Sequence, residues 1–141
     1  MFTYKKEGYE TLKQFFYPVI FEPEEVGISA YVPDIPGCMT QGDSIEEALE
    51  NVQEAIGLML DNIAPENYPE PSKPNKITID DEQFVMLVAF DKLVYDRKYN
   101  AKAVKKTLSI PAWLNNMAME QNINFSNVLQ KALMNELGLN R

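Results

Sequence analysis

The chain has 141 residues, of which 45% are hydrophobic and 11% aromatic, so its composition fits one ordinary globular domain or two small ones and argues against wholesale disorder. It contains no histidine and a single cysteine, Cys38, which excludes an intrachain disulfide and removes the most common general base and transition-metal ligand. Because no apolar run is long enough to span a bilayer and residues 1–14 lack the apolar core of a signal peptide, we expect a soluble cytoplasmic protein.

Charge is divided unevenly along the chain. Residues 1–100 hold eight basic and nineteen acidic side chains, a net charge of −11, whereas residues 101–141 hold five basic and two acidic side chains, a net charge of +3; together these give the −8 of the whole chain. This asymmetry indicates a polyanionic partner for the tail and a basic partner for the body. An acidic surface that only keeps the body in solution is the alternative interpretation.

Three β-strands are predicted in the first part of the body, over residues 15–21, 27–35 and 38–42. The first is FFYPVIF, which is rich in aromatic and β-branched residues. The segment PDIPG (33–37) ends the second strand because proline cannot donate a ladder hydrogen bond. The three strands therefore form a meander.

A helix over residues 44–63 follows, and its pattern is the clearest in the chain. Ser44 and Glu47 form the S-x-x-E capping box, and apolar residues recur at intervals of three and four on one face. A proline-rich loop (64–75) comes next, and the continuously apolar run FVMLVAF (84–90) is predicted as a buried strand of the same sheet. The predicted body is a βββαβ domain within an α+β fold.

The residue pattern of the tail (101–141) predicts one strand (104–110) and two helices, about 111–121 and 125–138. Such a small unit leaves its strand unpaired, so we expect a homodimer in which two strands pair antiparallel. Side chains of Lys105, Thr107 and Ser109 then project outward from the ribbon into the major groove of DNA. Lys106, which alternation places on the other face of the strand, is a further candidate for DNA contact. Asn124, Phe125 and Ser126 open the second helix, whose free N–H groups suit a phosphate.

This tail resembles the ribbon-helix-helix repressor family over residues 103–139. The resemblance is carried by the alternating strand KKTLSI, by Ile110-Pro111 entering the first helix, and by Asn124-Phe125-Ser126 entering the second. In that family three outward strand residues contact bases, and they correspond here to Lys105, Thr107 and Ser109. The resemblance therefore implies binding to double-stranded operator DNA.

The body resembles the HicB antitoxins of bacterial toxin–antitoxin pairs. The resemblance is carried by YPVIFE, by the turn AYVPDIPGC, by TQGD and by the helix start SIEEALEN within residues 17–56. It implies a partial RNase H-like domain that binds and blocks a small basic HicA-like ribonuclease, and a tail that represses the antitoxin's own operon. The implied domains are an N-terminal extension of open role (1–14), a toxin-binding domain (15–90), a connector (91–103) and a DNA-binding domain (104–141).

Carboxylates on the body are the candidates for contact with such a toxin, because they can occupy a basic surface that binds RNA phosphates. The candidates near the strand ends and on the helix are Glu22, Glu24, Asp34, Glu46, Glu47, Glu50 and Glu54. We expect no catalytic residue, no metal and no cofactor.

Two other functions fit parts of the sequence. A metal-dependent nuclease would gather carboxylates such as Asp34, Glu47 and Asp80, but Glu47 already serves the capping box. A stand-alone ribbon-helix-helix repressor would use the body to sense a small organic ligand. A neighbouring reading frame for a short basic protein favours the antitoxin over this second alternative.

Overall fold

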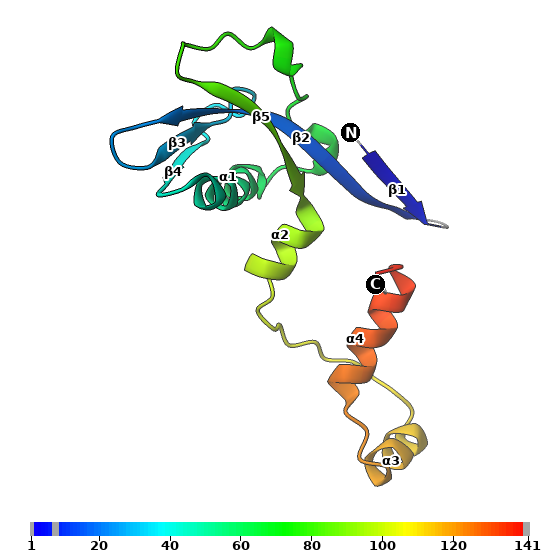
Figure 1. The fold of residues 1–141 in the computed structure, drawn as a ribbon. Helices are drawn as coiled ribbons and strands as arrows, with labels where there is room; N and C mark the ends of the chain where they lie inside the picture. The colour runs from blue at the N-terminus through cyan, green and yellow to red at the C-terminus, as the bar shows by residue number, and fades with distance from the viewer. Residues whose placement is uncertain (1, 7–8, 140–141) are drawn as a thin grey trace. The chain divides into compact units, whose positions relative to one another are not determined.

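The computed structural model describes residues 2–6 and 9–139, with side chains from Gln14 onward. The described chain divides into two compact units, of which the first comprises residues 2–4 and 12–101 and the second residues 5–6, 9–11 and 102–139. Strands and helices both contribute (Figure 1), so the predicted α+β class is confirmed. None of the described helices is long and apolar enough to cross a membrane.

The sheet of the first unit is organised around the long strand β2 (Tyr9–Pro23). Strand β3 (Ile28–Tyr31) and strand β5 (Phe84–Asp91) both pair antiparallel with β2, and β4 (Met39–Gly42) pairs with β3. Strand β1 (Phe2–Lys6) pairs with β2 as well, which makes a five-stranded sheet. The three predicted strands of the meander and the predicted pairing of residues 84–90 with this sheet are confirmed.

Two strand boundaries differ from the prediction. The second strand ends at Tyr31 rather than at Ile35, because the chain turns there: Ile35 N–H donates to the Val32 carbonyl (3.2 Å) and Cys38 N–H donates to the Ile35 carbonyl (3.0 Å). The first strand begins at Tyr9 rather than at Phe15, so it extends into the N-terminal extension, which also contains β1.

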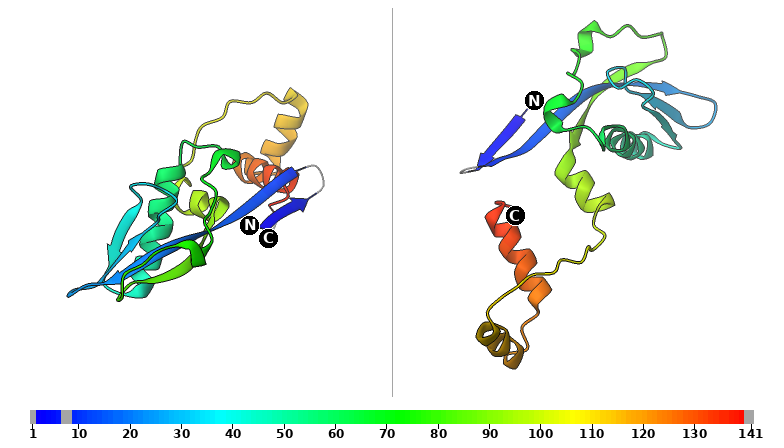
Figure 2. Two further views of the ribbon diagram at one scale, coloured as in Figure 1. Left: turned by 90° about the horizontal axis from the view of Figure 1, so that it is seen from above. Right: turned by 180° about the vertical axis from the view of Figure 1, so that it is seen from behind.

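Helix α1 (Ile45–Leu60) covers one face of the sheet (Figure 2). Its predicted start is confirmed, since the Ser44 hydroxyl accepts a hydrogen bond from Glu47 N–H (3.1 Å) and the Glu47 carboxylate accepts one from Asp43 N–H (3.3 Å). The apolar face of α1 is buried against alternate residues of β2, β3 and β5. These core side chains are Ala48, Val52, Ile56 and Leu60 of the helix, and Tyr17, Val19, Phe21, Ala30 and Val88 of the sheet.

The proline-rich segment after α1 is attached to the first unit. It contains two 3₁₀ turns, Pro65–Asn67 and Pro74–Lys76. The Tyr17 hydroxyl donates to the Pro69 carbonyl (2.8 Å), and Ser72 N–H donates to the Asp34 carboxylate (2.8 Å). The segment is therefore fixed at two points by residues far away in the sequence.

Helix α2 (Lys92–Tyr99) follows β5 directly and packs on α1. The Asp91 carboxylate caps it by accepting from Leu93 N–H (2.9 Å) and Val94 N–H (3.2 Å). The ring of Tyr95 lies over Gly57 of α1 so closely that a Cβ atom at Gly57 would lie 2.1 Å from its Cε2 atom. Only glycine at this position allows the two helices to approach as they do.

The second unit contains helices α3 (Ala112–Glu120) and α4 (Phe125–Glu136), which match the two helices predicted over about 111–121 and 125–138. The Asn124 side chain caps α4 by accepting from Asn127 N–H (3.0 Å). Gly138 ends the helix region with a φ of 70°, a left-handed conformation that glycine adopts without strain.

Replacing Gly57 with alanine tests the contact between α1 and α2. Alanine favours a helix by about 1 kcal/mol over glycine, yet we expect Gly57→Ala to lower the free energy of unfolding, because overpacking of this kind costs about 1–3 kcal/mol. Thermal and urea denaturation measure the change. In a Tyr95→Ala background the same substitution should cost nothing or stabilise; an equal loss in both backgrounds contradicts the proposed contact.

Candidate functional surfaces

The second unit leaves its apolar side chains exposed. Helices α3 and α4 contain no buried residue in the single chain. Trp113, Met117 and Val128 are 63%, 58% and 54% exposed. Large apolar side chains at helical spacing normally face a core, so these two helices do not complete one by themselves.

The predicted DNA-contacting residues of the tail all lie on this second unit. Lys105, Lys106, Thr107 and Ser109 are exposed, and residues 101–110 have no regular secondary structure in the single chain. The strand predicted for residues 104–110 needs a second strand for its backbone hydrogen bonds, so it stays a prediction. Residues 124–126 do open a helix, as predicted, and the Asn124 side chain is engaged in its cap.

The predicted acidic residues of the body are dispersed over several places. Asp34 holds Ser72, and Glu47 completes the cap of α1, so both have structural partners. Glu46 is exposed at the start of α1. The remaining four residues lie in two separate grooves of the first unit, described next. Of these environments, the sequence predicts only the cap formed by Glu47.

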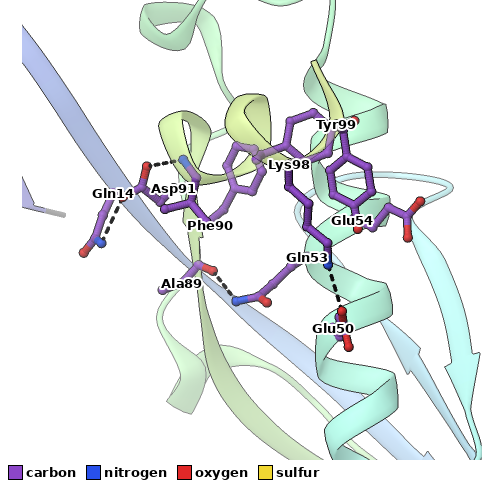
Figure 3. A pocket seen from close by; sticks show the side chains of 11 residues that line it. Gln14, Glu50, Gln53, Glu54, Ala89, Phe90, Asp91, Lys98 and Tyr99 are labelled. Atoms are coloured by element: carbon purple, nitrogen blue, oxygen red, sulfur yellow. Dashed lines mark hydrogen bonds and ion pairs between the residues drawn. The ribbon is translucent and has the colours of Figure 1, made fainter. Parts of the chain in front are cut away.

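The first groove, here called the α1–α2 groove, lies between α1, α2 and β5 and has a volume of about 450 Å³ (Figure 3). Glu50 and Glu54 line it, and Lys98 Nζ lies 2.8 Å from the Glu50 carboxylate. Through hydrogen bonding and charge, Lys98 lowers the pKa of Glu50 and Glu50 raises the pKa of Lys98. The two charges offset each other, which reduces the negative potential of this groove.

Other polar groups of the α1–α2 groove are also engaged. Gln53 Nε2 donates to the Ala89 carbonyl (3.1 Å), and Gln14 Nε2 donates to the Asp91 carboxylate (3.3 Å), as Figure 3 shows. Burial raises the pKa of the Tyr95 phenol, with Asp61 and Glu54 contributing. These interactions bind the helices to the sheet rather than present free groups to a substrate.

The second groove, here called the outer-face groove, lies on the sheet face opposite to α1. Alternation along β2 and β3 places Val19, Phe21 and Ala30 in the core and the residues between them on this other face. The groove has a volume of about 660 Å³, and its wall includes Ile20, Glu22, Glu24, Tyr31, Met39 and Gln83. None of its described lining residues is basic. Its carboxylates were predicted from the sequence but its apolar residues were not, because strand alternation does not tell which face of a sheet is covered.

The carboxylates considered for a metal-dependent nuclease do not gather. Asp34 binds Ser72, Glu47 binds Asp43 N–H, and Asp80 lies in a turn with Gln83. Within the described part of the chain, no group of three or more His, Cys, Asp or Glu side chains is arranged to hold a metal ion.

Comparison with known proteins gives a consistent family. The model of the HicB-like antitoxin of bacterial toxin–antitoxin systems matches residues 17–133. A UPF0150 protein of Synechocystis sp. is 40% identical over 65 residues, which are 45% of this chain and 82% of that protein. The antitoxin HicB 2 of Photorhabdus laumondii is 45% identical over 49 residues, 35% of each chain.

The fold has a counterpart among solved structures. A chain of a toxin–antitoxin complex from Streptococcus pneumoniae superposes with a TM-score of 0.54 at 24% identity, covering 88% of this chain and 99% of that one. Because the family model spans most of the sequence, both units included, the chain belongs to the HicB-like antitoxin family of bacterial toxin–antitoxin systems.

Proposed function

We propose that the chain is an antitoxin with two binding activities and no catalytic role. The first unit binds and inhibits a small basic HicA-like toxin that cleaves mRNA. The second unit pairs with that of another chain, binds operator DNA and represses the operon that encodes both proteins. The opposite charge of the two units is the observation that carries this proposal.

The first unit is suited to a basic partner. Residues 14–72 contain no lysine or arginine, although they include β3, β4, α1 and most of the core strand β2. A ribonuclease needs a basic surface to hold RNA phosphates. A protein of opposite charge competes for that surface, and charge complementarity raises both its association rate and its specificity.

The second unit is suited to a second copy of itself. The exposed apolar side chains of α3 and α4, together with Leu108 and Ile110 at 57% and 47% exposure, need a partner surface of the same kind. Pairing of two 104–110 segments as an antiparallel ribbon satisfies their backbone groups and buries Leu108 and Ile110 under four helices. Lys105, Thr107 and Ser109 of both chains then face outward, where they fit the major groove.

A stand-alone repressor is the second candidate. The volume of the α1–α2 groove falls within the range of small-molecule sites, and a ligand there would make the first unit a sensor. Growth of cells expressing the adjacent small basic reading frame separates the two functions: toxicity relieved by this chain supports the antitoxin, and a harmless neighbour supports the repressor.

Removing two outward side chains of the ribbon tests DNA binding. We expect Lys105→Ala with Thr107→Ala to weaken binding to DNA from the chain's own promoter by about 1–3 kcal/mol for each side chain that reads a base, and to reduce sequence preference. Fluorescence anisotropy of labelled DNA at fixed salt measures both effects. Lys131→Ala, which removes a charge from α4 outside the ribbon, is the control. Unchanged affinity of the double variant for promoter DNA contradicts the ribbon assignment.

Truncation tests which residues neutralise the toxin. A fragment of residues 1–101 keeps β5 and α2, so we expect it to restore growth of cells that express the toxin. A fragment of residues 1–75 should fail, because it lacks the buried Val88 and Phe90 and leaves β2 without its partner strand. Colony counts and the soluble yield of each fragment are the readouts. A soluble and fully protective 1–75 fragment contradicts the requirement for β5.

A further inference from the structure

We propose that the toxin docks in the outer-face groove of the sheet, and not on α1 or in the α1–α2 groove. This inference rests on the proposed function, because it names the surface through which the first unit binds a basic ribonuclease. Three observations carry it: an apolar row across the sheet, two acidic turns at one sheet end, and the absence of an opposing cation among the groove's described residues.

The apolar row crosses four strands. The register pairs Val85 with Ile20, Ile20 with Tyr31, and Tyr31 with Met39, so these four side chains lie side by side on the face away from α1. Met39 is 65% and Tyr31 38% exposed. A continuous apolar strip of this kind gains free energy when a partner covers it, and aromatic and methionine side chains are enriched at protein interfaces.

Strand pairing brings two acidic turns to one end of this strip. Phe21, the last core residue of β2, pairs with Phe84, the first residue of β5. The end of β2 with the start of the turn after it (Glu22–Glu25) and the turn that precedes β5 (Asp80–Glu82) are therefore neighbours, although 55 positions separate Glu25 from Asp80 in the sequence. Glu22 and Glu24 line the outer-face groove, and so does Gln83, adjacent to the second turn.

The lining residues of both grooves carry a formal charge of −2, but only the outer-face groove has no cation among its described lining residues. In the α1–α2 groove, Lys98 lies against Glu50 and offsets its charge. The described residues that line the outer-face groove include no lysine or arginine. Its apolar strip with a carboxylate border fits a protein surface that carries apolar side chains bordered by lysine and arginine, which is the chemistry of an RNA-binding protein.

The exposed side of α1 offers less continuous apolar area. Ile45 is exposed at its start, and Leu58 and Met59 near its end, at 43%, 64% and 43%. Thirteen residues separate Ile45 from Leu58, a distance of about 20 Å along a helix. In the sheet row, by contrast, neighbouring side chains on adjacent strands lie about 5 Å apart. A partner can therefore cover the sheet row as one patch. At protein interfaces, the residues that contribute most to the binding free energy are clustered in this way.

A matched pair of arginine substitutions tests the docking surface. Met39 and Leu58 are equally exposed, at 65% and 64%, but lie on opposite sides of the first unit. The probe is the purified small basic protein of the adjacent reading frame, in a catalytically inactive form, titrated into the full-length chain by calorimetry. We expect Met39→Arg to weaken binding about tenfold or more and Leu58→Arg to change it less than about twofold.

A charge-reversal pair provides an independent measurement. Glu22→Lys with Glu24→Lys should weaken binding and lower the association rate. Glu54→Lys with Asp61→Lys, which adds the same charge on the α1 side, should have a smaller effect. Melting temperatures of all four variants within a few degrees of the wild type exclude unfolding as the cause. Hydrogen exchange of the wild-type complex should show added protection in β3, β4 and residues 22–25.

The outcomes separate this inference from the proposed function. If the wild-type chain does not bind the basic protein, the proposed function is wrong and the docking surface is wrong with it. If the wild type binds and Leu58→Arg weakens binding more than Met39→Arg, only the docking surface is wrong. If Met39→Arg changes the oligomeric state of the chain alone in sedimentation, the outer face is a self-association surface, which also overturns the inference.

Discussion

The pairing of β5 with β2 is the constraint on which the first unit depends. Eight residue pairs, from Gln14↔Asp91 to Phe21↔Phe84, join segments separated by a helix and a long loop. This register completes the core with Val88 and Phe90, and it places Asp91 where its carboxylate both accepts from Gln14 and caps α2. The same register brings the two acidic turns to one end of the sheet. Core, connecting helix and candidate docking surface thus follow from one long-range strand pairing.

Local chemistry made much of this fold predictable. The capping box at Ser44 and Glu47 and the regular apolar spacing specify α1 through contacts within a few residues. Continuous apolar character correctly indicated a strand over residues 84–90 but not its burial, since only Val88 and Phe90 are buried and Leu87 is 53% exposed. The end of α1 was predicted less well, because no C-terminal glycine or capping pattern in the sequence marks that boundary. The helix stops at Leu60, three residues before its predicted end.

The features that sequence reasoning missed depend on contacts between distant residues. Alternation along β2 and β3 divides their residues into two faces, but only the packing of α1 determines which face is covered, so Tyr31 and Met39 looked no different from core residues. Glu50 and Asp34 are both acidic residues of the body, yet Glu50 pairs with Lys98 and Asp34 holds the proline-rich segment through Ser72. The partner proposed for the 104–110 segment is a second copy of the chain, which the sequence of one chain does not specify by local pattern alone.

The location proposed for the toxin bears on how the two activities are linked. Helix α2, through which the first unit continues into the tail, packs against α1 by inserting Tyr95 over Gly57, on the opposite side of the sheet from the outer-face groove. A toxin in that groove leaves this contact intact, so toxin and DNA need not compete for the same residues. If the proposed toxin and operator binding hold, coupling between them would come from valency, because bound toxin would change how two tethered dimers reach adjacent half-sites. By linkage, operator DNA would then alter toxin affinity by the same factor.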